Sequence, residues 1–121
     1  MPTVIDKESS EGAVLFALAD EAAGGADSAL SGELVVGEDD CLGVQSPEYG
    51  GFVSVVFPWQ SDWHSGDSDA VTLGPDSQFA VGDVVSLGGG LESRLLDPIR
   101  ERCPAATEVF LADRLSERTS S

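Results

Sequence analysis

The segment from Val81 to Gly90 constrains the fold of this chain more than any other. Gly82-Asp83 has the composition of a tight turn, because glycine tolerates the backbone angles that turns require and aspartate accepts hydrogen bonds from nearby N–H groups. Residues 84–87 favour a short apolar strand, and we expect the glycines at 88–90 to end it. No helical pattern follows these glycines, so they do not form a phosphate-binding loop. They indicate a close approach of two backbones or the rim of a barrel.

The rest of the chain from Leu30 repeats this alternation of short apolar runs and turn residues. The runs contain many β-branched and aromatic residues, and Gly, Pro, Asp and Ser separate them, which is typical of strands joined by turns. The most strand-like run is apolar on both faces and is therefore expected at the centre of a sheet. This central run is 52–57, and the other expected strands are 33–36, 41–44, 70–73, 78–81, 84–87 and 108–112.

These six or seven short strands predict a mainly β fold: a small OB-like β-barrel, closed or partly open, with one or two short helices. A β-sandwich is the alternative. A turn at 37–40 is expected to join the first two strands in a hairpin. Near the end of the chain we expect a short helix, with Asp97 as its N-cap and Pro98 at its first position.

The 121 residues fit a single domain. We divide it into an N-terminal segment (1–29), the barrel (30–115) and a loose tail (116–121). The apolar run at 13–19 fits either a helix capped by Ser9 or Ser10 or a buried strand, and periodicity does not separate the two. We expect the helix. The run is too short to cross a bilayer, so no membrane insertion is expected.

Charge is the second strong feature of the sequence. The chain carries 22 acidic residues against 6 basic ones, a formal net charge of −16, and Lys7 is the only basic residue before position 91. A surface of this sign repels phosphate backbones and anionic lipids. Nucleic-acid binding is therefore not expected. The acidity predicts a basic partner protein, or else it serves only to keep the protein in solution.

Cys41 and Cys103 are the two cysteines, and they allow one bridge. In a reducing compartment such cysteines are more often free and buried, and their spacing matches no metal-binding motif. No basic segment precedes a hydrophobic one at the N-terminus, which predicts a cytoplasmic protein. The alternative is an exported or cell-envelope domain whose leader has been removed.

Several segments follow one another in a characteristic order: Ser-Gly-Glu-Leu-Val-Val at 31–36, Asp-Cys-Leu at 40–42, Val-Val-Phe-Pro at 55–58, the region of Trp63, and the segments 81–90 and 99–103. This order, over roughly 31–112, resembles a family of small β-barrel domains from actinobacteria, many of them in exported or lipid-anchored proteins. The family has no assigned activity, so the resemblance implies a fold and a structural Cys41–Cys103 pair rather than a chemistry. A bridge enclosing about 60 residues would stabilise the fold by roughly 4 kcal/mol in the chain-entropy model.

A catalytic site is not expected. His64 is the only histidine, and it lies close to Ser61 and Asp62. A Ser-His-Asp hydrolase also needs an exposed nucleophile and an oxyanion hole, and the chain has no Gly-x-Ser-x-Gly elbow. A small hydrolase using His64 is therefore the least favoured alternative. A nucleophilic cysteine is not expected either, because both cysteines are expected to be structural. No cofactor is expected.

Two polar segments are the candidates for a contact surface: the acidic residues of the turn at 37–40, and a loop expected at 58–69, the tryptophan loop, which contains both tryptophans. Exposed aromatic side chains often anchor partners, although one of the two tryptophans is expected to close the barrel. The carboxylates suit Ca²⁺, but neither segment has the EF-hand pattern, so no metal is predicted. The candidate binding residues are Glu38, Asp39 and Asp40 in the turn and Trp59, Asp62, Trp63, His64, Asp67 and Asp69 in the loop.

We therefore expect a non-enzymatic acidic module with a binding or regulatory role. The main alternative is an immunity or inhibitor protein that neutralises a basic toxin or nuclease, for which acidic side chains would accelerate association.

Overall fold

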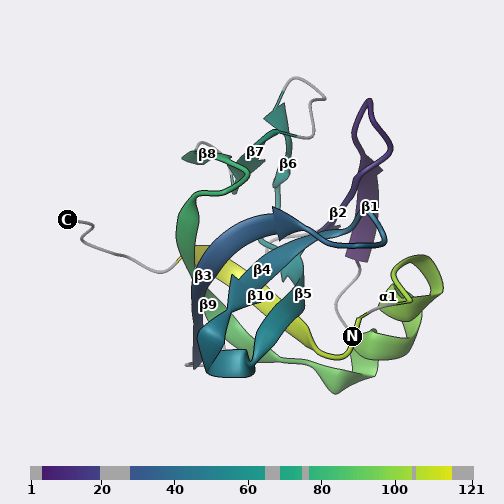
Figure 1. Ribbon diagram of the computed structural model, residues 1–121, viewed down its shortest axis with the longest axis vertical. Coiled ribbons are helices and arrows are strands. Elements are labelled where there is room, and N and C mark those ends of the chain that lie inside the picture. Colours follow the sequence, from purple (N-terminus) through teal and green to yellow (C-terminus); the bar gives the residue numbers. More distant parts are fainter. Residues whose placement is uncertain (1–3, 20–27, 65–68, 75–76, 105, 116–121) are drawn as a thin grey trace.

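A closed five-stranded barrel forms the centre of the computed structural model, which describes residues 4–19, 28–64, 69–74, 77–104 and 106–115. Strands account for 58% of these residues. Going round the barrel, β4 pairs with β3 and β5, β10 lies between β5 and β9, and β9 pairs with β3 to close it (Figure 1). The mainly β barrel predicted from the sequence is thus confirmed, and the alternative sandwich is wrong. The bounds are β3 Ser28–Val36, β4 Leu42–Ser46, β5 Gly51–Phe57, β9 Val84–Leu91 and β10 Val109–Leu115.

β5 is the most central strand, as its apolar sequence predicts. One of its edges pairs with β10 in parallel, and the other pairs first with β4 and then with β2. The hairpin formed by β3 and β4 is also confirmed, with Val36 opposite Leu42. Between β4 and β5 lies a short 3₁₀ helix, η1 (Pro47–Tyr49).

Residues 4–19 of the N-terminal segment form a hairpin of two strands, β1 (Val4–Glu8) and β2 (Val14–Leu18), so the helix expected at 13–19 is wrong. Every side chain of β2 is buried, Leu15 on one face of the sheet and Phe16 on the other. A segment buried on both faces has no polar period, so pairing with β5 rather than local pattern decides its conformation. Ser9 is therefore not a helix cap, and its Oγ instead accepts the N–H of Ala13 at 3.0 Å inside the hairpin turn.

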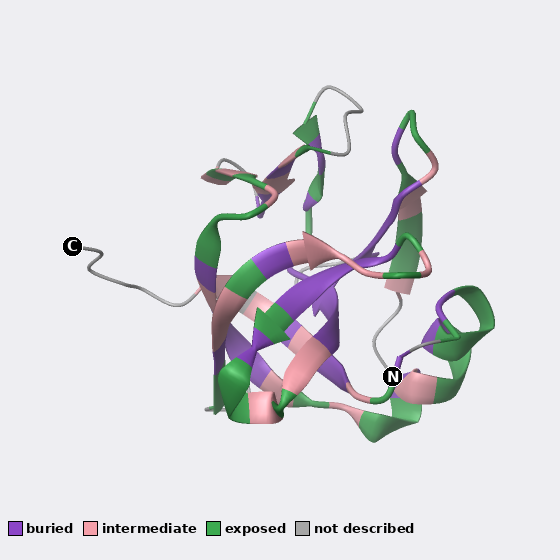
Figure 2. Cartoon of the chain, in the orientation of Figure 1, coloured by how far each residue is buried: buried purple, intermediate pink, exposed green. Residues whose placement is uncertain are grey.

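A second, three-stranded sheet comprises β6 (Asp62–Trp63), β7 (Ala70–Leu73) and β8 (Ser77–Ala80). Trp63, Val71 and Leu73 of this sheet belong to the same buried cluster as the interior of the barrel. Part of the loop expected at 58–69 is therefore a strand, while 65–68 lie outside the described residues. Figure 2 shows the buried residues running from the barrel into this sheet.

Two buried clusters lie on opposite faces of the barrel wall. The inner cluster fills the barrel, and the outer one packs under η3 (Ser93–Leu95) and α1 (Leu96–Arg102), with Leu95 and Ile99 among its members. The N-cap of α1 is Leu95 and not Asp97, as the sequence suggested, because η3 leads directly into α1. Pro98 is the third helical residue, where its missing N–H removes no helical hydrogen bond. No helix among the described residues is long and apolar enough to cross a membrane.

Gly88, Gly89 and Gly90 do not end β9, as the sequence suggested, but continue it to Leu91. They lie between β3 and β10, and Gly89 is opposite both Ser28 and Ala112. The alternative expectation, a close approach of backbones, is the one that the structure bears out. A Cβ placed on Gly89 would overlap the carbonyl oxygen of Leu111.

Candidate binding site

The β3–β4 connection is a compact turn of five residues, Gly37 to Cys41, which we call the acidic turn. The Gly37 carbonyl accepts the N–H of Asp40 at 3.0 Å, and the Gly37 N–H donates to the Cys41 carbonyl at 2.9 Å. Asp40 has a φ of 64°. This is the hairpin loop in which a turn is followed by one left-handed residue. The geometry fixes the carboxylate-bearing positions 38–40 relative to the sheet.

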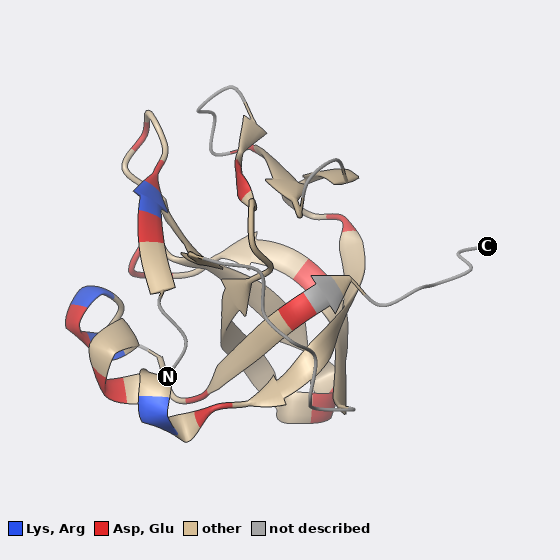
Figure 3. Ribbon diagram, turned by 180° about the vertical axis from the view of Figure 1, so that it is seen from behind, with Lys and Arg blue, Asp and Glu red and all other residues tan. Residues whose placement is uncertain are grey.

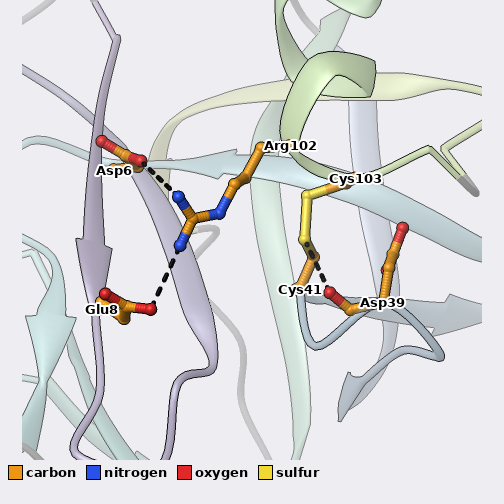
Figure 4. Close-up of a disulfide and its surroundings, with 6 residues drawn as sticks. All are labelled: Asp6, Glu8, Asp39, Cys41, Arg102 and Cys103. Atoms are coloured by element: carbon orange, nitrogen blue, oxygen red, sulfur yellow. Dashed lines mark hydrogen bonds and ion pairs between the residues drawn. A yellow bond between two sulfur atoms is a disulfide. The ribbon is translucent and has the colours of Figure 1, made fainter.

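Two further contacts fasten the acidic turn to the rest of the protein. The Val14 N–H donates to the Asp40 carbonyl at 2.7 Å. A disulfide joins Cys41 to Cys103 at the end of α1, with Cα atoms 6.2 Å apart and both residues only 1% exposed. The Asp39 carbonyl oxygen lies 3.6 Å from the Cys41 Sγ (Figure 4). A disulfide sulfur has no proton to donate, so this is a van der Waals contact in the oxidised protein.

Because Asp40 has a left-handed backbone conformation, alanine and glycine at this position are expected to change the free energy of unfolding by different amounts. Asp40→Ala should lower the free energy of unfolding by about 1 kcal/mol, because alanine is strained at positive φ. Asp40→Gly should be neutral or slightly stabilising, since glycine removes that strain but costs unfolded-chain entropy. Urea unfolding of the two variants measures the difference. Equal effects would show that the backbone angle does not determine the stability of the turn.

Beside the acidic turn lies a groove of about 510 Å³ on the outer face of β3, β4 and β5. We call it the acidic groove. Its walls combine aliphatic side chains, one aromatic ring, one amide and two carboxylates, which are exposed or partly exposed. The lining residues are Val35, Val36, Gly37, Glu38, Asp39, Gln45 and Phe52.

The groove exists because two glycines carry no side chain beneath an aromatic ring. A Cβ on Gly43 would lie 2.6 Å from the Phe52 Cζ, and a Cβ on Gly37 would lie 3.2 Å from the same atom. The Phe52 ring therefore occupies the space that side chains would fill at both positions. Any larger residue at Gly43 would have to displace Phe52 and would also meet the Val53 carbonyl oxygen.

No Lys or Arg side chain of the described part of the chain lines the acidic groove. Instead Lys7 pairs with Asp62 at 3.7 Å, and Arg102 reaches Glu8 at 3.2 Å. Arg94 donates hydrogen bonds to Glu92 and lowers the pKa of that carboxyl. Among the residues coloured in Figure 3, the basic ones lie on β1 and in the region of η3 and α1. The field at the acidic groove is therefore negative.

The described residues of the tryptophan loop do not join the acidic turn in one surface, because none of them lines the groove. Trp63 is 5% exposed, and its indole N–H donates to the Lys7 carbonyl at 2.9 Å, so it closes the barrel and cannot touch a partner. Asp62 accepts the Trp63 N–H at 2.7 Å. Trp59 is 39% exposed, and it remains available for contact.

The other predicted loop residues have separate positions. His64 and Asp69 are exposed, and Asp67 lies outside the described residues. Ser61 is fully buried, and its Oγ accepts the N–H of Gly74 at 2.9 Å, so this hydroxyl is not presented to a substrate. Both cysteine sulfurs are in the disulfide and provide no nucleophile.

Because the indole of Trp63 is buried and that of Trp59 is exposed, we expect phenylalanine substitutions at the two positions to differ in their effect on the free energy of unfolding. Trp63→Phe should lower the free energy of unfolding by about 1–2 kcal/mol, because the Lys7 carbonyl loses a donor in a region shielded from water. Trp59→Phe at the exposed position should change it by less than about 0.5 kcal/mol. Thermal or urea unfolding of the pair measures both. If Trp63→Phe proved as mild as Trp59→Phe, the indole hydrogen bond would make no net contribution.

Of the three acidic residues predicted from the sequence, Glu38 and Asp39 line the groove, whereas Asp40 is exposed and does not. The apolar half of the groove was not predicted. Phe52 was assigned only to a central strand, and Gln45 was given no role. Only the pairing of β4 with β5 places these residues together: Gly43 is opposite Ser54, and Gln45 is opposite Phe52. Once the hairpins are aligned, the glycines and the ring fall on one face.

Comparison with known proteins gave no match: no family model, no curated protein and no solved structure is similar to this chain.

Proposed function

We propose that this protein is a non-enzymatic binding module whose acidic groove receives a basic segment of a partner protein. The observation that carries the proposal is the pairing of an aromatic floor with carboxylates at one end of the same groove. The chain as a whole has a net charge of −16, which favours positively charged partners over nucleic acids or anionic membranes. We propose no catalytic role for any residue.

The lining suits a lysine or arginine side chain. The long stem of such a residue packs on apolar surface while its head stays polar, and here Val35 and Phe52 provide that surface. An aromatic ring attracts a cation placed over its face, and the carboxylates of Glu38 and Asp39 form charge-assisted hydrogen bonds with the same head group. The acidic turn is held before binding, which reduces the entropy cost of association.

We also propose that the barrel is OB-like, and the order of its strands supports this by analogy. Numbered along the chain, the barrel strands follow the circular order first, second, third, fifth, fourth, with the third and fifth parallel. OB barrels have this order, and they bind ligands on the second and third strands and on the loops beside them. Gln45 lies on the second strand and Phe52 on the third. Because fold alone does not determine the ligand, the charge of the groove argues for a basic one.

The inhibitor of a basic toxin or nuclease is a narrower form of the same proposal. Such proteins depend on fast, electrostatically steered association that salt slows. A groove prearranged by the disulfide and the Val14–Asp40 hydrogen bond fits this use. Steep salt dependence of the association rate would support the inhibitor form, and a salt dependence confined to the dissociation rate would contradict it.

The test is an NMR titration of ¹⁵N-labelled protein with a short peptide that contains two arginines and two leucines. The matched control peptide carries citrulline, which is neutral and has nearly the same shape, in place of arginine. We expect the amide signals of Gly37, Glu38 and Gly43 to move with the arginine peptide only. Shifts spread evenly over exposed carboxylates, or equal shifts with the citrulline peptide, would overturn the proposal.

Two double variants separate the groove from the general charge of the protein. Glu38→Gln/Asp39→Asn should weaken binding about tenfold, because it removes two ion pairs that contribute up to about 1 kcal/mol each. Asp69→Asn/Asp97→Asn removes the same charge at two exposed positions outside the groove, and its affinity should stay within about twofold. Equal weakening by both variants would show that only net charge matters.

The disulfide supports an oxidising compartment, and with it the exported or cell-envelope location, because such bonds persist there and are rare in the cytosol. We expect protein isolated from its native compartment to show no titratable thiol after denaturation without reductant. Two titratable thiols would contradict the exported location and favour the cytoplasmic one.

A further inference from the structure

The disulfide and the acidic turn together hold three potential metal ligands. One ligand atom from each of Asp39, Cys41 and Cys103 lies within 4.8 Å of the other two. Figure 4 shows them side by side, two from the β3–β4 connection and one from the end of α1. In the oxidised protein the two sulfurs are bonded to each other and are poor ligands. In the reduced protein they become thiols, which are good ligands once deprotonated.

We propose that the reduced form of this protein binds one zinc ion through Cys41, Cys103 and Asp39. Zinc prefers thiolate and carboxylate ligands at about 2.0–2.3 Å in tetrahedral geometry. Ligands at that distance are about 3.3–3.8 Å from one another. At present the Asp39 carboxylate oxygen lies within 4.8 Å of both sulfurs, and the sulfurs are bonded to each other. Zinc binding therefore requires that the sulfurs separate once their bond is broken and that the carboxylate moves closer to them. Water fills the fourth position.

The surroundings fit a metal that enters from one side. Both cysteines are 1% exposed within the outer buried cluster, where an apolar shell strengthens the attraction between thiolates and a cation. Asp39 is only partly buried and lines the acidic groove, which gives the ion and its water a path from solvent. The negative field of the groove raises the local concentration of divalent cations.

Zinc binding first requires reduction of the Cys41–Cys103 disulfide, for which a dithiol is the reductant. The dithiol transfers two electrons and two protons to the Cys41–Cys103 bond, which breaks to give two thiols, while the dithiol becomes a cyclic disulfide. Zinc then displaces the two thiol protons into solvent and forms two zinc–sulfur bonds. Asp39 contributes a carboxylate without further proton transfer. The oxidised and zinc-bound states exclude each other, and neither depends on the function proposed for the groove.

The test uses the same chain in both redox states. The protein is reduced with a dithiol, freed of reductant without air and titrated with Co²⁺, whose thiolate complexes absorb in the near ultraviolet and visible. We expect one equivalent of Co²⁺ to produce thiolate charge-transfer and tetrahedral bands, and one equivalent of Zn²⁺ to remove them. The oxidised protein should give neither band. Equal spectra for the two states, or no thiolate band after reduction, would overturn the proposal.

Asp39→Asn tests the third ligand in a chain that keeps both cysteines. We expect its Zn²⁺ affinity, measured by competition with a chromophoric chelator, to fall more than about tenfold, since even indirect changes around a metal cost about 10–100-fold. Asp69→Asn, at an exposed position away from the disulfide, is the matched control and should retain the affinity. An Asp39→Asn affinity equal to that of Asp69→Asn would remove Asp39 from the site.

Discussion

Removing the Cys41–Cys103 bridge is expected to lower the free energy of unfolding by about 4 kcal/mol. The two cysteines are 62 residues apart in sequence, so the bridge closes a long loop and restricts the unfolded chain strongly. The cost is large for a domain of this size, whose total stability is of the order of 5–15 kcal/mol. The bridge also joins two distant parts of the fold, the acidic turn and the end of α1.

The measurement is urea unfolding of the Cys41→Ala/Cys103→Ala variant beside the oxidised and the reduced wild type. Alanine is preferred to serine because both positions lie in an apolar cluster, where an unpaired hydroxyl would add its own cost. Relative to the oxidised wild type, the variant and the reduced, metal-free wild type should show similar losses in the free energy of unfolding, since both lack the cross-link. The variant should retain its far-ultraviolet circular dichroism, because Leu95 and Ile99 still hold α1 against the sheet.

The ion pairs of Arg102 are not expected to replace the bridge in holding α1. Its guanidinium lies 3.2 Å from Glu8 and 3.9 Å from Asp6, but all three side chains are well exposed, so the pairs contribute little. A loss below about 1 kcal/mol for the bridge variant would mean that the unfolded chain is already compact. It would contradict the chain-entropy explanation.

Turn chemistry and apolar content were sufficient to predict most of the barrel. Gly37 to Asp40 combines a glycine with three acidic residues between two apolar runs, and this local signal specifies the β3–β4 hairpin. The segment 52–57 is apolar on both faces and rich in β-branched and aromatic residues, which is typical of a strand covered on both faces of its sheet. These features act within a few residues, so sequence alone reveals them.

The features that sequence reasoning missed depend on contacts between distant segments. The run at 13–19 became a strand because it pairs with β5, about 40 residues later in the chain. Asp97 did not become an N-cap because η3 precedes α1 without a break. The acidic groove required knowledge of which residue of β4 is opposite Phe52. Its carboxylates were visible in the sequence, but its shape comes from the register.

Gly89→Ala is expected to destabilise the protein by about 3 kcal/mol or more, because two costs combine at this position. Gly89 has a φ of 155°, which side-chain-bearing residues rarely adopt. A Cβ there would overlap the Leu111 carbonyl oxygen and lie 3.1 Å from the Cα of Ala112. These are backbone atoms of β10, so relief requires β9 and β10 to move apart, and overpacking of this kind costs about 1–3 kcal/mol by itself.

Gly50→Ala is the matched control, because it carries the backbone cost without the overlap. Gly50 has a φ of 80°, and a Cβ on it would meet no atom within 4 Å. We expect the free energy of unfolding of this variant to fall by only about 1 kcal/mol. The excess for Gly89→Ala over Gly50→Ala in urea unfolding therefore measures the close approach of β9 to β10. Equal losses would mean that the strands adjust freely, and that the three glycines are not needed to close the barrel.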